Sequence, residues 1–103
     1  MIRRLARREQ IYVVEVQGHK LDSLNCYEFE NPQSVRQLLS KTFDLAHTYV
    51  SPHDILFDRV KGQVWWNGGC AQIGQWILSD NGESKVYNSL EEVKKSFDVV
   101  GTE

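Results

Sequence analysis

The chain has 103 residues and a formal net charge of −2, which is the size of one ordinary domain. Its apolar content of 41% and charged content of 25% are typical of a globular protein. No run of about 18 apolar residues predicts a membrane span, and two cysteines, Cys26 and Cys70, are too few for a disulfide framework. We therefore expect a single cytoplasmic domain over residues 1–103.

Charge is distributed unevenly along the chain. Residues 1–20 hold five basic and two acidic side chains, whereas residues 80–103 hold three basic and six acidic ones. The body of the protein is therefore mildly acidic. This balance disfavours nonspecific nucleic-acid binding by the body, because such binding depends on many basic contacts to phosphate.

The basic end is the segment MIRRLARRE, residues 1–9. Helical spacing would place its apolar residues on one side and its arginines on the other. Nine residues are too few for a stable isolated helix in water, so we expect a short basic arm that docks on the domain or orders on a partner. Its phosphate-binding candidates are Arg3, Arg4, Arg7 and Arg8.

The first half of the core, which we expect to span residues 10–101, predicts two strands and a helix. Residues 10–18 and 24–30 are rich in alternating, β-branched and aromatic residues, and a polar loop is expected between them. Asn31 is expected to cap the following helix, with Pro32 at its first position. Its predicted apolar face includes Val35, Leu38 and Leu39.

The second half predicts two hairpins and a second helix. Residues 55–66 form the first hairpin, and residues 73–88 form the second around the Asn81-Gly82 turn, the strongest hairpin signal in the chain. This turn would set Trp76 opposite Tyr87. Ser89 and Glu92 make a capping box for a helix that would continue to Gly101.

The resulting order is β-β-α-β-β-β-β-α. Strands joined by short turns predict an α+β fold in which about six antiparallel strands form one sheet and two helices pack on one face. The basic N-terminal arm precedes this core.

The stretch VWWNGGCAQIGQW, residues 64–76, holds all three tryptophans. Adjacent strand residues point to opposite faces, so Trp65 and Trp66 cannot share one core. We expect Gly74 to lie in a strand beside one of these rings. The exposed aromatic surface predicted here, with one lysine beside it, contains Trp65, Trp66, Trp76, Tyr87 and Lys85.

The same stretch raises the alternative of cysteine chemistry. Gly68, Gly69 and Cys70 resemble the surroundings of a nucleophilic thiol, because glycine backbone N–H groups can stabilise an oxyanion. No local signature is complete, however, and the candidate bases are distant in sequence: His19, His47 and His53.

Metal and nucleotide motifs are missing from the sequence. His47 and His53 have five residues between them, but no cysteine pair accompanies them as in zinc sites. The glycines match neither phosphate-binding template. We therefore expect no metal and no cofactor.

The leading hypothesis is a small non-catalytic interaction protein, of the inhibitor, immunity or accessory-subunit type. It would bind a protein partner, or a second copy of itself, through the aromatic surface. Nucleic-acid binding through the arginine arm is the first alternative, with bases stacking on the aromatic rings. A small cysteine-dependent enzyme is the second.

Overall fold

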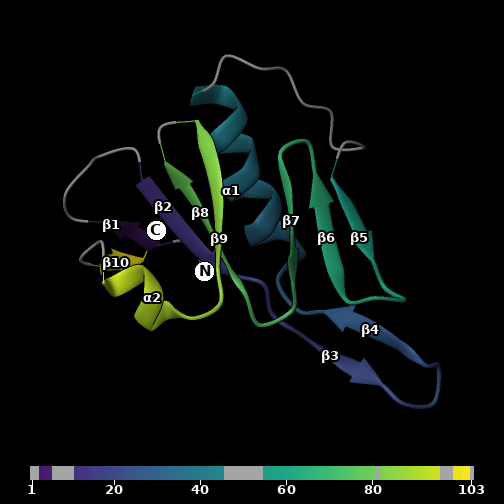
Figure 1. Cartoon of the computed structure of the whole chain (residues 1–103). Helices are drawn as coiled ribbons and strands as arrows, with labels where there is room; N and C mark the ends of the chain where they lie inside the picture. Colours follow the sequence, from purple (N-terminus) through teal and green to yellow (C-terminus); the bar gives the residue numbers. More distant parts are fainter. Residues whose placement is uncertain (1–2, 6–10, 46–54, 81, 96–98, 103) are drawn as a thin grey trace.

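The computed structural model describes residues 3–5, 11–45, 55–80, 82–95 and 99–102. Two helices and several antiparallel strands make up this part of the chain (Figure 1), so the predicted α+β class is confirmed. The prediction of a single six-stranded sheet is wrong, because the described strands divide among three sheets. One cause is Gly74, whose φ of +98° turns the chain where two of these sheets separate.

The largest sheet contains the predicted second hairpin. Trp76 lies opposite Tyr87 and Asp80 opposite Glu83, which confirms the register, although Asn81 lies outside the described residues. In spatial order its strands are β10 (Val99–Thr102), β1 (Arg3–Leu5), β2 (Ile11–Glu15), β8 (Trp76–Asp80) and β9 (Glu83–Tyr87).

Two smaller sheets lie beside it. One is the hairpin of β3 (Gly18–Leu21) and β4 (Cys26–Phe29). The polar loop predicted through Gly18, His19 and Lys20 is instead a strand, whose residues pair with β4 from Gly18 opposite Phe29 to Leu21 opposite Cys26. The other sheet contains, in spatial order, β5 (Leu56–Asp58), β6 (Gln63–Trp66) and β7 (Gly69–Gln72).

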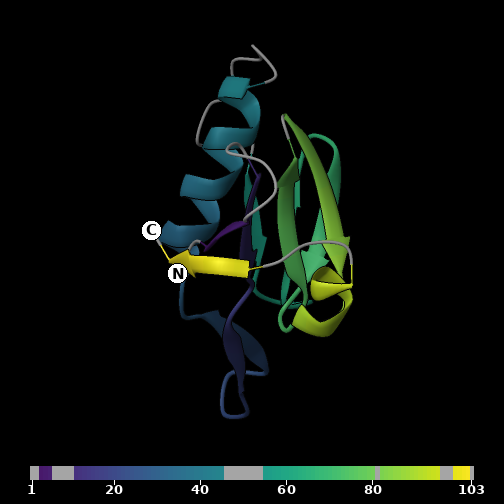
Figure 2. The same cartoon turned by 90° about the vertical axis from the view of Figure 1, so that its left-hand side faces the viewer.

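The two helices, α1 (Pro32–Leu45) and α2 (Leu90–Lys94), lie on opposite faces of the largest sheet (Figure 2). The prediction that both cover one face is therefore wrong. Val14 packs in the core that contains α1, whereas its neighbour Val13 packs with Val93 of α2. Because successive residues of β2 point to opposite faces and both are apolar, each face needs its own cover.

The chain ends differ most from expectation. Residues 3–5, predicted to lie in a short basic arm that docks on the domain or orders on a partner, form strand β1 between β10 and β2. A strand in this position can pair its backbone on both sides, whereas a nine-residue helix leaves much of its backbone unpaired. The C-terminal helix ends at Lys94. Of the residues through which it is predicted to continue to Gly101, residues 96–98 lie outside the described residues, and those from Val99 onward belong to strand β10.

The two predicted helix caps have different outcomes. Ser89 Oγ accepts a hydrogen bond from Glu92 N at 3.3 Å, as predicted. Asn31 uses its side chain differently: Oδ1 accepts from Gln17 N at 2.9 Å, and Nδ2 donates to Glu15 O at 2.6 Å. Asn31 thus ties the start of α1 to the end of β2 instead of capping the helix.

The core under α1 extends beyond the largest sheet into the sheet of β5, β6 and β7. Trp66 is the largest side chain of this extension and is only 7% exposed. Its Nε1 donates a hydrogen bond to Ser84 Oγ of β9 at 3.0 Å. One indole therefore joins two sheets, by packing and by a directed polar contact. The buried residues of this core are Val14, Val16, Val35, Leu38, Leu39, Ile55, Val64, Trp66, Ala71 and Ile77.

Replacing Trp66 by alanine should lower the free energy of unfolding by about 3–5 kcal/mol, because a large buried ring is lost. Replacing its neighbour Trp65, which is 43% exposed, should cost about 1 kcal/mol or less. Urea denaturation followed by circular dichroism measures both losses. Equal losses for the two variants would contradict this assignment of faces.

Candidate functional site

The tryptophan stretch forms two strands joined by the two-residue turn Asn67-Gly68. Gly68 has a φ of +125°, which favours glycine. A Cβ added at Gly69 would lie 3.0 Å from Cζ2 of Trp66, so glycine leaves room there for the indole. The expectation that Gly74 plays this part is wrong: it lies in a turn, and an added Cβ would meet nothing within 4 Å.

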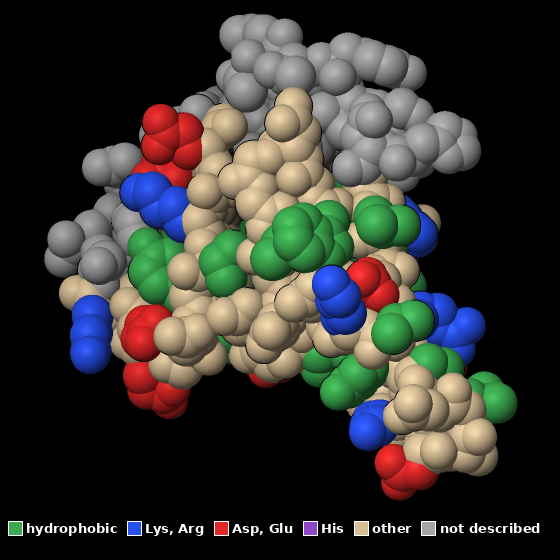
Figure 3. Space-filling view, turned by 45° about the vertical axis from the view of Figure 1, so that its right-hand side comes forward, with side chains coloured by type: hydrophobic (Ala, Val, Ile, Leu, Met, Phe, Trp, Pro, Cys, Tyr) green, Lys and Arg blue, Asp and Glu red, His purple; other side chains and the backbone are tan. Residues whose placement is uncertain are grey.

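The face of this sheet turned away from the core carries a cross-strand row of apolar side chains. Leu56 of β5 lies opposite Trp65 of β6, which lies opposite Cys70 of β7. Leu56 is 59% exposed, Trp65 is 43% exposed and Cys70 is half-buried. We call these three residues the outer row. Figure 3 shows hydrophobic side chains gathered on this side of the molecule.

A polar row lies beside the outer row. Asp58, Gln63 and Gln72 are cross-strand neighbours, two residues along their strands from the outer row. Asp58 Oδ1 accepts hydrogen bonds from the backbone N–H groups of Val60 and Lys61 at 3.0 and 3.1 Å. Its carboxylate therefore holds the β5–β6 turn. The exposed face is thus apolar along one row and polar along the next.

The structure separates the predicted aromatic set. Trp65 belongs to the outer row, whereas Trp66 is in the core. Trp76 and Tyr87 are partly buried and pack against the apolar cluster under α2. Lys85 is exposed, and its Nζ lies 3.4 Å from Asp80 Oδ2. Of the three tryptophans, Trp65 is the most accessible to a partner.

The thiols have few polar neighbours among the described residues. The guanidinium of Arg59 lies 3.7 Å from Cys26 Sγ through Nη2. His19 is engaged elsewhere, with Nδ1 2.8 Å from Glu30 Oε1. The other candidate bases, His47 and His53, lie outside the described residues. The described part of the chain contains no group of three or more His, Cys, Asp and Glu that could hold a metal ion.

Only two of the four candidate arginines lie within the described residues. Arg3 and Arg4 belong to β1, between two other strands of the largest sheet. Arg7 and Arg8 lie outside the described residues. The two described arginines therefore sit within a paired strand rather than in a free arm.

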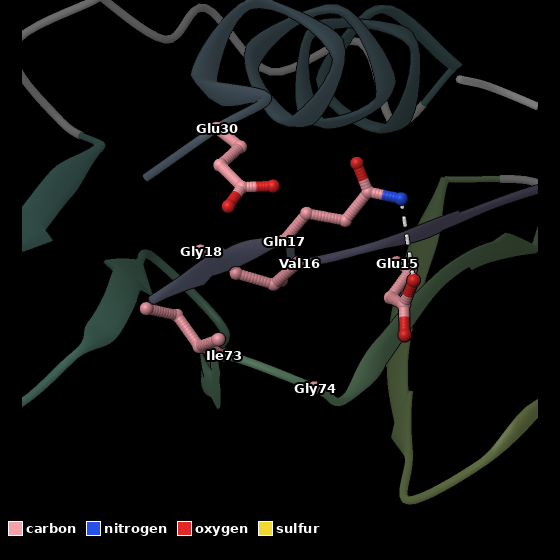
Figure 4. A pocket seen from close by; sticks show the side chains of 7 residues that line it. All are labelled: Glu15, Val16, Gln17, Gly18, Glu30, Ile73 and Gly74. Carbon is pink, nitrogen blue, oxygen red and sulfur yellow. Dashed lines mark hydrogen bonds between the residues drawn. The ribbon is translucent and has the colours of Figure 1, made fainter. Parts of the chain in front are cut away.

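A surface hollow of about 330 Å³, which no sequence motif predicted, lies where β2 passes into β3 (Figure 4). Its acidic side chains have partners within the chain. Gln17 Nε2 donates to Glu15 Oε1 at 3.3 Å, and Glu30 contacts His19. The lining residues are Glu15, Val16, Gln17, Gly18, Glu30, Ile73 and Gly74.

The sequence patterns also did not predict that Leu56 and Val60 lie on the surface, where they are 59% and 76% exposed. The signal for Leu56 was present in the predicted hairpin over residues 55–66, because its register sets Leu56 opposite Trp65. Val60 lies in the turn of that hairpin, where alternation gives no information about direction.

Comparisons of the chain with models of protein families, with curated proteins and with solved structures find no match. Within the described ranges, no helix has the length and apolar character needed to cross a membrane.

The outer row can be tested with a bimane label on Cys70 in a Cys26→Ser background. Trp65 is its cross-strand neighbour, so their Cβ atoms should be about 5 Å apart, and contact with the indole should quench the label. Trp65→Phe should raise the fluorescence several-fold, whereas Trp66→Phe, on the other face, should leave it unchanged. Equal recovery in both variants would contradict the register.

Proposed function

We propose that this chain is a small non-catalytic protein that binds a protein partner through the outer row. The observation that supports this most directly is the exposure of two neighbouring apolar side chains: Trp65 is 43% exposed and Leu56, opposite it, is 59% exposed. Large aromatic and aliphatic side chains supply most of the binding energy of protein interfaces when they enter a pocket of the partner. The proposal covers inhibitor, immunity and accessory-subunit types of action.

The buried face behind the outer row supports the proposal. On the opposite face of the same strands, Val64 and Ala71 are fully buried and Trp66 nearly so, within the core that contains α1. The strands that display Leu56 and Trp65 are therefore held in place before binding. A preformed surface loses less conformational entropy when it docks.

The proposal places the protein in the cytoplasm, where thiols remain reduced. Cys26 and Cys70 are both free cysteines, which fits that compartment. The alternative of nucleic-acid binding through the N-terminal arm is weaker, since Arg3 and Arg4 belong to a strand paired on both sides.

Site-specific photo-cross-linking in cells of the native host tests the proposal. A photoreactive residue at Gln72, exposed beside the outer row, should capture one discrete protein, whereas the same residue at Gln33, exposed on α1, should not. Trp65→Ala or Leu56→Ala should lower the yield about tenfold or more, as expected of interface hot spots.

Leu24→Ala is the matched control, because Leu24 is 66% exposed in the β3–β4 turn, and this turn is the end of the hairpin that lies away from β6 (Figure 1). This variant should leave the yield unchanged. A folded Trp65→Ala variant that cross-links as well as the parent protein would refute the proposed surface.

A further inference from the structure

We infer that the partner segment that docks on the outer row carries acidic side chains beside its apolar ones. This inference rests on the proposed binding function and adds the chemistry of the partner. It comes from three basic residues that the fold gathers next to the outer row: Lys20, Arg59 and Lys61.

Tyr27 of β4 is the point at which these three residues meet. Lys20 is its cross-strand neighbour in β3. Arg59 forms two hydrogen bonds with Tyr27. The backbone oxygen of Arg59 accepts from Tyr27 N at 2.7 Å, and Arg59 Nε donates to Tyr27 O at 3.1 Å. The Tyr27 ring lies against Gly62, next to Lys61, where an added Cβ would be 3.0 Å from Cγ of the ring. We call Lys20, Arg59 and Lys61 the basic cluster.

The basic cluster lacks acidic partners. Within the ranges that the structure describes, none of its three side chains forms an ion pair. Asp58, the nearest acidic residue in sequence to Arg59 and Lys61, uses Oδ1 to accept from two backbone N–H groups of the turn. Glu28 points to the opposite face of the β3–β4 hairpin, where it lies 3.8 Å from His19. The three basic side chains, set against the one nearby carboxylate of Asp58, therefore leave a net positive charge on this surface for a partner to meet.

The basic cluster and the outer row lie within reach of one short segment. Gly62 and Trp65 are three residues apart along β6 and the turn before it, which corresponds to about 10 Å in extended chain. Val60 adds an apolar side chain, 76% exposed, in the same turn. Figure 3 shows Lys and Arg side chains beside the hydrophobic ones on this side of the molecule, with an acidic side chain next to the basic one at the centre.

An acidic peptide segment fits this surface better than a nucleic acid. Trp65 is the only ring of the outer row that could stack on a base, whereas its exposed apolar neighbours Leu56 and Val60 are aliphatic. Three cations are few for phosphate-driven binding, and the chain as a whole carries a charge of −2. Carboxylates on the partner would complement the basic cluster and favour correct pairing as well as fast association.

The test is a random 12-residue peptide library displayed on phage, selected on the whole protein and depleted on the Trp65→Ala variant. The recovered peptides should be enriched in Asp and Glu next to apolar residues. Their affinity should fall at least fivefold in the Lys20→Gln, Lys61→Gln double variant. The matched control is Lys94→Gln, Lys95→Gln, which removes two exposed lysines at the end of α2 and should change nothing.

The outcomes separate the two proposals. Trp65-dependent peptides without acidic enrichment would overturn the acidic partner and leave the outer row as a binding surface. A library that yields no Trp65-dependent peptide would overturn both. Binding of single-stranded DNA or RNA 20-mers that depends on Lys20 and Lys61, or a Trp65-dependent dimer in native mass spectrometry, would also overturn the inference by identifying another occupant.

Discussion

The fold and its surface depend on the alternation of Trp65 and Trp66 in β6. Adjacent residues of a strand must point to opposite faces. The inward indole, Trp66, packs in the core under α1 and donates to Ser84 of β9, which joins the small sheet to the large one. With that indole inside, the geometry of the strand directs Trp65 outward. The alternation of the strand therefore explains both the stabilising contact of Trp66 and the exposure of Trp65.

A partner can bind to a sheet only on a face that no helix or other sheet packs against. The helices α1 and α2 pack on opposite faces of the largest sheet, although Val86 on its edge strand β9 is still 37% exposed. The sheet of β5, β6 and β7 has one face in the core, whereas its other face displays Leu56 and Trp65. The β3–β4 hairpin is tied to the β5–β6 turn through Arg59 and Tyr27, which brings basic side chains beside the apolar row.

The sequence predicted those parts of the fold that local chemistry decides. The Asn81-Gly82 turn gave the register of Trp76 and Tyr87, and the capping box gave the start of α2. The sequence did not predict structure that depends on contacts between distant segments. Strands β1 and β10, for example, pair residues from the two ends of the chain, and no local pattern signals that contact. Alternation placed Trp65 and Trp66 on opposite faces, but which one is buried depends on Gly69 and Ser84, whose positions only the tertiary fold supplies.

Hydrogen exchange of the three indole N–H groups, measured by NMR on protein labelled with ¹⁵N-tryptophan, tests the central claim most directly. The Trp66 indole is buried and bonded to Ser84 Oγ, so its N–H should exchange at least about 100-fold more slowly than that of Trp65. Assignment follows from single Trp→Phe variants. Comparable protection of Trp65 and Trp66, or faster exchange at Trp66, would contradict the account.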